Sequence, residues 1–272
     1  MDNTTHTAAG AKYWIYNPNS KKTIVVVHGL RGTHHGLQFI AAALPQYRFI
    51  IPDLPGFGES KPMGATHNEK NYAQWLGKFI TQLQLPKPPI VLGHSFGSII
   101  ASRYAADNPA SVPKLILINP ISKHGNKLGG LSAKAYYKLG ALLPEPVGTK
   151  LLKSRLITRL MSETMITTKQ KNLRVRVKEQ HFAYFATFAN RRSVHETFQA
   201  TMSGSVLQVA DQLTMPVLLI VGARDRFVPL HGQSQLHKKL PQSDLQIISN
   251  VGHLIHYETP EKAAEMIKKF VG

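Results

Sequence analysis

The stretch PIVLGHSFGSIIASRYA, residues 89–105, decides the fold. An apolar run typical of a buried strand ends at a serine between two glycines, and a helical pattern begins directly after it. The segment Gly93 to Gly97 matches G-x-S-x-G, which marks a sharp strand-to-helix turn that exposes a serine hydroxyl. A serine at a helix start is also a common N-cap. The motif alone therefore allows two interpretations, a helix cap and a nucleophile.

The neighbours of this serine favour the nucleophile. Gly93 and Gly97 allow the strand and the helix to pack closely around a tight turn. Ser95 then stands at the helix N-terminus, where the free N–H of Phe96 favours developing negative charge. His94 adjoins the serine but points elsewhere on the turn, and we interpret it as a structural residue.

A serine hydroxyl needs a base that takes its proton, and the base needs a carboxylate that orients it. Asp225 follows one apolar run and His253 follows the next, so the order Ser95, Asp225, His253 is the order of a nucleophile-elbow hydrolase. Alone, Asp225 is equally typical of a turn. His256 ranks second as the base, and Asn119 stands where an alternative acid would be.

Short runs rich in valine and isoleucine alternate with helical patterns along most of the chain. Such runs are typical of strands that are buried on both faces, and their alternation with helices predicts a mostly parallel, doubly covered α/β sheet. The runs are 22–29, 47–56, 88–95, 113–120, 215–225 and 244–253.

The alternation stops between two of these runs, where only helical patterns occur. Residues 122–208 therefore predict an all-helical cap insertion, and residues 1–121 and 209–272 form the predicted core. Apolar stripes over 149–166 and 172–189 are expected to line the acyl pocket.

Composition and charge limit which kinds of site and partner the chain can have. The 272 residues carry a net charge of +18 and no cysteine, which excludes disulfides and thiolate zinc sites. The basic excess is greatest in 122–208, and it fits ordinary solubility as well as a weak attraction to anionic lipid or an acidic substrate. No block of like charges indicates nucleic-acid binding. Because neither a signal peptide nor an apolar spanning run is visible, we expect a cytoplasmic protein.

Four segments, VVVHGLRG, IIPDLPGFGES, LGHSFGS and the pair GARDRFVP and VGH, resemble the α/β-hydrolase fold family over nearly the whole chain. The resemblance implies a compact serine hydrolase with a helical cap, and a His28-Gly29 motif whose next residue, Leu30, supplies a second oxyanion N–H beside that of Phe96. It implies no cofactor and no metal. Relatives that open epoxides or remove halides carry an aspartate at the elbow, and Ser95 argues against both activities.

We therefore expect hydrolysis of a carboxylic ester or related acyl bond of a small molecule through an acyl-serine. Two alternatives stay open, a hydrolase of the carbon–carbon bond of a vinylogous diketone and a non-catalytic ligand-binding homologue. The leaving group and the oligomeric state are not encoded in any motif.

Overall fold

The computed structural model of the chain describes residues 4–122 and 127–272. Its centre is one eight-stranded sheet with the strand order β1-β2-β4-β3-β5-β6-β7-β8. The pairs β1–β2 and β2–β4 are antiparallel, and every other neighbouring pair is parallel. The strands are β1 (His6–Ala8), β2 (Ala11–Tyr16), β3 (Thr23–Val27), β4 (Arg48–Pro52), β5 (Ile90–His94), β6 (Leu115–Ile118), β7 (Val217–Gly222) and β8 (Ser243–Ile248).

The inner strands show why the sequence runs are continuously apolar. In β3, Val25 and Val27 pack into one core, whereas Ile24 and Val26 pack into a second core on the opposite face. Successive side chains of a strand point to opposite faces, so a sheet covered on both sides requires apolar residues at every position.

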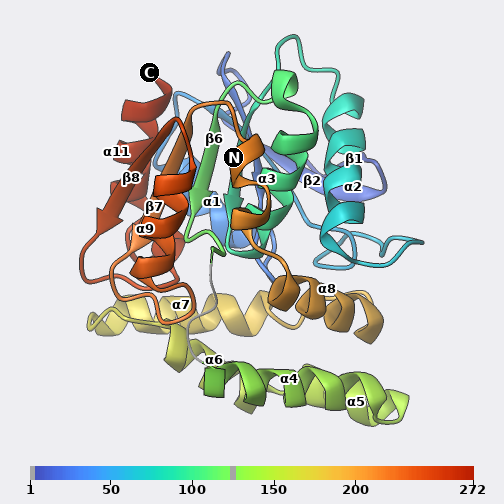
Figure 1. Ribbon diagram of the computed structural model, residues 1–272. Helices are drawn as coiled ribbons and strands as arrows, with labels where there is room; N and C mark the ends of the chain where they lie inside the picture. The colour runs from blue at the N-terminus through green and yellow to red at the C-terminus, as the bar shows by residue number, and fades with distance from the viewer. Residues whose placement is uncertain (1–3, 123–126) are drawn as a thin grey trace.

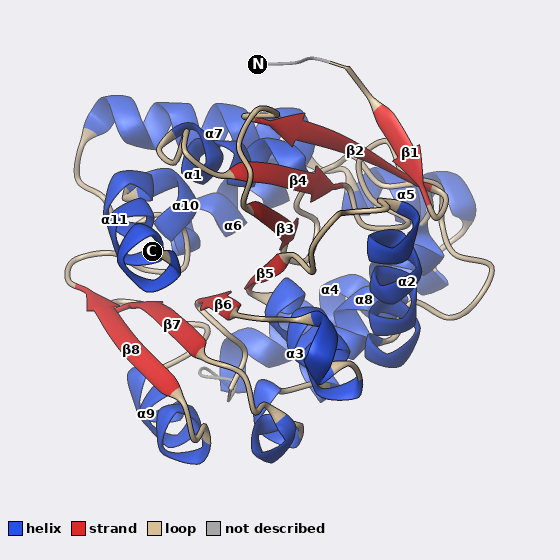
Figure 2. Ribbon diagram, turned by 90° about the horizontal axis from the view of Figure 1, so that it is seen from above, coloured by secondary structure: helices blue, strands red, loops and turns tan. Residues whose placement is uncertain are grey.

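Helices cover both faces of the sheet, as Figure 2 shows from above. The first layer consists of α1 (His34–Ala42), α10 (Ile255–Glu258) and α11 (Pro260–Val271), and the second of α2 (Glu69–Gln82), α3 (Phe96–Asp107) and α9 (Leu230–Lys239). The predicted doubly covered, mostly parallel α/β sheet is confirmed.

Among the described residues, five α-helices lie between β6 and β7 and cover one end of the sheet (Figure 1). We refer to residues 122–208, which contain them, as the insert. The helices are α4 (Lys127–Leu142), α5 (Glu145–Leu152), α6 (Arg155–Met165), α7 (Lys171–Tyr184) and α8 (Arg191–Ser203). In the described part of the insert the only β interaction is an isolated bridge from Phe188 to Phe57. No helix among the described residues is long and apolar enough to cross a membrane.

One expectation about the insert is wrong. The apolar stripe over 149–166 is not continuous, because Lys153 and Ser154 separate the end of α5 from the start of α6. Leu156 and Leu160 are 67% and 58% exposed, so neither side chain lines a buried pocket. A helical period shows which residues share a face, but it does not show which way that face points.

Candidate active site

Ser95 occupies the turn between β5 and α3. Its backbone has φ 53° and ψ −119°, a strained conformation for a residue other than glycine. Although Ser95 is the N-cap residue of α3, its side chain makes no capping hydrogen bond. A Cβ at Gly97 would lie 2.1 Å from the Val27 carbonyl oxygen, and one at Gly93 would lie 2.4 Å from the Gly97 oxygen. The two glycines are therefore required by close packing.

Three predicted residues meet at the carboxyl end of the sheet. Ser95 Oγ lies 2.8 Å from His253 Nε2, and His253 Nδ1 lies 2.7 Å from Asp225 Oδ2. The other oxygen of Asp225 accepts hydrogen bonds from the N–H groups of Phe227 and Val228 at 2.8 and 3.2 Å. Because a carboxylate only accepts, Nδ1 carries the imidazole proton and Nε2 is free to accept from the serine.

The loop that carries Leu30 lies against this serine. A Cβ at Gly29 would lie 3.1 Å from Ser95 Cβ, so the loop passes the serine in van der Waals contact. Neither the Leu30 N–H nor the Phe96 N–H has a hydrogen-bond acceptor among the described residues. Two free amides beside a nucleophile are suited to stabilising an oxyanion.

His28 holds this loop in place. Its Nδ1 donates to the Gly29 carbonyl oxygen at 2.8 Å, and its Nε2 accepts the Leu54 N–H at 2.8 Å. Burial lowers the pKa of His28, so the ring is kept neutral and each nitrogen keeps its role. His28 therefore acts on the backbone around the site.

Two further histidines surround the triad without contacting the Ser95 hydroxyl. His94 Nε2 donates to the backbone oxygen of His253 at 3.2 Å, which agrees with a structural role. The ring of His256, the second-ranked base, lies 4.4 Å from that of His94. The His256 Nδ1 is buried without a hydrogen-bond partner in the part of the chain that the structure describes.

Asn119 is a positioning residue that sequence reasoning missed. Its amide nitrogen donates to the backbone oxygens of Gly252 and His253 at 3.1 and 3.0 Å, and its side-chain oxygen accepts the Gly222 N–H at 2.8 Å. The side chain thereby joins the ends of β6 and β7 to the loop that carries the histidine. The only sequence signal was its place directly after an apolar run.

Thr167, in the insert, is a second such residue. Its hydroxyl accepts the Gly252 N–H at 2.9 Å and donates to Glu258 Oε2 at 2.6 Å. Its own N–H donates to Glu258 Oε1 at 2.7 Å. The insert therefore contacts the backbone directly before His253.

Arg31 links the insert to the other side of the site. The residue is 1% exposed, and its guanidinium donates to the backbone oxygens of Phe185 and Leu152 at 3.0 and 2.7 Å and to the Tyr136 hydroxyl at 3.1 Å. Among the described residues no carboxylate forms an ion pair with it. It joins the loop after Leu30 to three helical segments of the insert.

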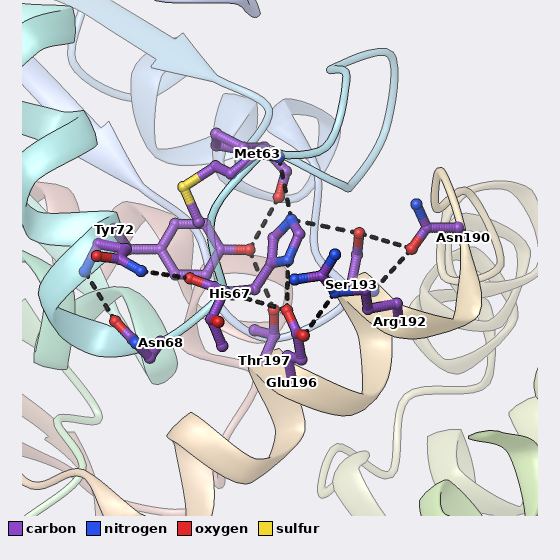
Figure 3. Close-up of polar contacts among 12 residues, drawn as sticks. Met63, His67, Asn68, Tyr72, Asn190, Arg192, Ser193, Glu196 and Thr197 are labelled. Atoms are coloured by element: carbon purple, nitrogen blue, oxygen red, sulfur yellow. Dashed lines mark hydrogen bonds and ion pairs between the residues drawn. The ribbon is translucent and has the colours of Figure 1, made fainter. Parts of the chain in front are cut away.

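A second serine–histidine–carboxylate group lies where α8 meets the loop before α2 (Figure 3). His67 Nδ1 lies 2.9 Å from Glu196 Oε2, and His67 Nε2 lies 3.3 Å from Ser193 Oγ. Glu196 Oε2 also accepts the His67 backbone N–H at 2.8 Å. The residue types are those of a triad, so the geometry has to decide its role.

The geometry identifies this group as a structural contact. His67 Nε2 accepts the Met63 N–H at 3.2 Å, which occupies its lone pair. The Ser193 hydroxyl donates to Asn190 Oδ1 at 3.0 Å, and Ser193 is completely buried. A Cβ at Gly56 would lie 2.6 Å from Ser193 Cβ, which leaves no room for a substrate carbonyl. The group holds α8 against the core.

Titration of buried histidines is expected to destabilise the fold at acidic pH. Burial lowers the pKa of His181 to about 4 and that of His94 to about 3, where the nearby His253 adds to the shift. Between these values and pH 6.5 the folded chain keeps both rings neutral, whereas the unfolded chain protonates them. The stabilisation is complete above pH 6.5, and by pH 5 about 2 kcal/mol is lost for each histidine.

Urea unfolding at a series of pH values between 7 and 5 measures this loss. His181→Asn removes one of the two groups, so its free energy of unfolding should decline less over the same range. His231→Asn, at an exposed position on α9, controls for the effect of replacing a histidine by an asparagine. A free energy of unfolding that stays constant over this range would contradict the prediction.

No group of three or more histidine, cysteine, aspartate or glutamate side chains within residues 4–122 and 127–272 is arranged to hold a metal ion.

Comparisons with known proteins identify the family of the chain. A family model described as alpha/beta hydrolase fold matches residues 22–260. Lipase 1 of Psychrobacter immobilis is 27% identical over 97% of this chain and 82% of its own length. A 2-hydroxy-6-oxononadienedioate/2-hydroxy-6-oxononatrienedioate hydrolase of a Pseudomonas species is 26% identical over 83% of this chain and 77% of its own length.

A solved esterase from Exiguobacterium antarcticum superposes with a TM-score of 0.80 and 20% identity, over 98% of each chain. The names of these similar proteins describe a lipase, an esterase and a hydrolase of a 2-hydroxy-6-oxo acid.

Proposed function

Because the chain belongs to the α/β-hydrolase fold family, we propose that it is a serine hydrolase that cleaves a carboxylic ester or related acyl bond. The hydrogen-bonded series Ser95, His253, Asp225 is the observation that carries the proposal. The order of these residues along the chain supports the same assignment.

The first half of the reaction forms the acyl-serine. Ser95 Oγ attacks the substrate carbonyl carbon while His253 Nε2 takes the hydroxyl proton. The negative charge on the carbonyl oxygen is stabilised by the N–H groups of Leu30 and Phe96. Asp225 stabilises the imidazolium, which then protonates the departing alcohol.

The second half releases the acid. Water attacks the acyl carbon and His253 takes its proton, and the tetrahedral intermediate collapses with return of that proton to Ser95 Oγ. The net change is addition of one water across the acyl bond, and Ser95 and His253 regain their starting protonation states.

The insert acts as a cap in this proposal, with residues 1–121 and 209–272 as the core. Support comes from its contacts around the site, since Arg31 contacts it beside Leu30 and Thr167 contacts it beside His253. Ser95 and His253 are each 9% exposed, so the reacting groups are largely shielded from bulk water.

A fluorophosphonate probe and a panel of p-nitrophenyl esters of graded chain length test the proposal. We expect one probe molecule per chain, attached to Ser95 in the peptide mass map, and turnover of at least one ester. If the folded chain resists the probe, the hydrolase assignment fails and a ligand-binding homologue is favoured.

A second candidate is hydrolysis of the carbon–carbon bond of a vinylogous diketone. It is supported by the 26% identity to the Pseudomonas hydrolase of that substrate class. A 2-hydroxy-6-oxo-dienoate assayed beside the esters separates the two, because the better substrate has the higher kcat/KM.

Loss of the Thr167 hydroxyl is expected to lower kcat by about tenfold with a smaller change in KM. Thr167→Val keeps the side-chain shape but leaves the Gly252 N–H and a Glu258 oxygen without their partner, so the backbone before His253 is less well positioned. Steady-state kinetics with an ester substrate measures the effect. Thr167→Ser retains the hydroxyl and should restore kcat, and equal losses in both variants would contradict a positioning role.

A further inference from the structure

Large apolar side chains are exposed mainly on one part of the molecule. Seven of the nine exposed large hydrophobic residues in the described ranges belong to the insert. Six of them occupy α4, α5 and α6, which lie on the far side of α7 and α8 from the sheet (Figure 1). We call these six the outer face: Leu131, Leu139 and Leu142 of α4, Val147 of α5, and Leu156 and Leu160 of α6.

Helix α6 buries its polar side and exposes its apolar side, which is the reverse of an ordinary surface helix. It buries Thr158 and Ser162, and the Ser162 hydroxyl lies 2.7 Å from His181 Nδ1 of α7. Leu156 and Leu160, one turn apart, are 67% and 58% exposed. The polar side is used for packing within the insert, and the apolar side is left without a protein partner in the described structure.

Helix α4 presents a similar apolar stripe to solvent. Leu139 and Leu142 follow Leu131 by about two and three helical turns, and the three leucines are 51%, 70% and 67% exposed. Tyr137 and Gly140, on the opposite side of the helix, are buried. Two helices of the insert therefore turn leucines outward, and exposed apolar side chains that gather on one part of a molecule mark an interaction site.

The insert that carries these leucines is strongly basic. The insert contains fifteen lysine and arginine residues and four glutamates, three of which already form ion pairs with arginines of the insert. Six exposed basic residues in α4, α5, α6 or the turn between the last two form no ion pair with a carboxylate among the described residues, although Lys153 and Arg155 lie over the rings of Phe188 and Phe182. They are Lys134, Lys138, Lys150, Lys153, Arg155 and Arg159.

We propose that the outer face docks on an anionic lipid bilayer. The exposed leucines enter the boundary between headgroups and acyl chains, and the lysines and arginines of the insert contact lipid phosphates. Arg159 follows Leu156 by three residues, so the two side chains are neighbours on the surface of α6, and Arg155 lies one turn before Arg159.

Two other partners fit the face less well. A second copy of the chain would bring two strongly basic surfaces together, which repel each other. A nucleic acid would satisfy the charge, but single strands bind on aromatic platforms, and the outer face is aliphatic. The proposal rests on exposure and charge alone, so it is independent of the proposed hydrolysis.

Vesicle sedimentation with the full chain tests the proposal. We expect binding to phosphatidylcholine vesicles that contain about 30 mol% phosphatidylglycerol, much weaker binding to phosphatidylcholine alone, and partial release in about 0.5 M NaCl. The double variants Leu156→Ser/Leu160→Ser and Arg155→Gln/Arg159→Gln should each lower the partition coefficient roughly tenfold or more.

Matched controls separate the outer face from overall charge and hydrophobicity. Lys268→Gln/Lys269→Gln on α11 makes the same change in net charge, and Ile247→Thr on β8 makes one exposed aliphatic residue polar outside the insert. Both should bind like the unmodified chain, and thermal unfolding should show that all four variants are folded.

Three results would overturn the proposal. The first is no binding to either vesicle, and the second is an equal loss of binding in the Lys268→Gln/Lys269→Gln control. The third is a dimer in sedimentation velocity that Leu156→Ser/Leu160→Ser dissociates, which would assign the outer face to a second copy.

Discussion

Ser95→Ala is expected to lower kcat toward an ester by about 10⁵-fold while the chain stays folded. Alanine cannot form the acyl intermediate, so the free amides of Leu30 and Phe96 and substrate binding are all that remain to accelerate attack by water. The hydroxyl makes no capping bond in α3, and its removal deletes only the contact with His253. Initial rates with the best ester of the panel and far-UV circular dichroism measure the two halves of this prediction.

Ser193→Ala is the matched control for this variant. Ser193 also lies beside a histidine that is paired with a carboxylate, but this histidine, His67, already accepts the Met63 N–H. We expect kcat to be unchanged and the free energy of unfolding to fall by about 1 kcal/mol, because a buried hydrogen bond is lost. Ester hydrolysis by Ser95→Ala at more than a few per cent of the unmodified rate would point to a different nucleophile.

The sheet could be predicted from the sequence because its inner strands are buried on both faces. Five of the six apolar runs contain one of the strands β3 to β7, and the sixth covers β8 except for Ser243. The first run places Ile24 and Val25 in opposite cores. The short β1 lacks such a signal, since two of its three residues are not buried.

The insert could be predicted only in part. Its helical character follows from the apolar period, but the direction of each apolar face depends on what the helix packs against. In α6 the hydrogen bond between Ser162 and His181 turns the polar side inward, and no local pattern encodes that choice.

The three triad residues of the candidate site could be predicted from the sequence, but the residues that position them could not. Ser95, Asp225 and His253 each follow a strand at the same edge of the sheet, so their meeting follows from the topology. Asn119 and Thr167 contact the histidine loop from positions more than 80 residues away in sequence, through side chains that occur commonly in turns. Only the tertiary structure brings these contacts together.

Asp225→Asn is expected to lower kcat by about 10⁴-fold with little change in KM or in the fold. One oxygen of Asp225 accepts the N–H groups of Phe227 and Val228, and an asparagine must keep its oxygen there. The amide NH₂ then faces His253 Nδ1 and donates to it. The imidazole proton moves to Nε2, which can no longer accept the proton of Ser95.

Asp211→Asn makes the same chemical change at an exposed carboxylate whose ion-pair partner is Lys239 at 3.7 Å, and it should keep the unmodified kcat. Steady-state kinetics of both variants on one ester, with urea unfolding as the check on folding, measures the difference. If Asp225→Asn keeps a kcat within about tenfold of the unmodified chain, the tautomer of His253 does not limit the reaction. The role of Asp225 as the orienting carboxylate would then be wrong, even if Ser95→Ala is inactive.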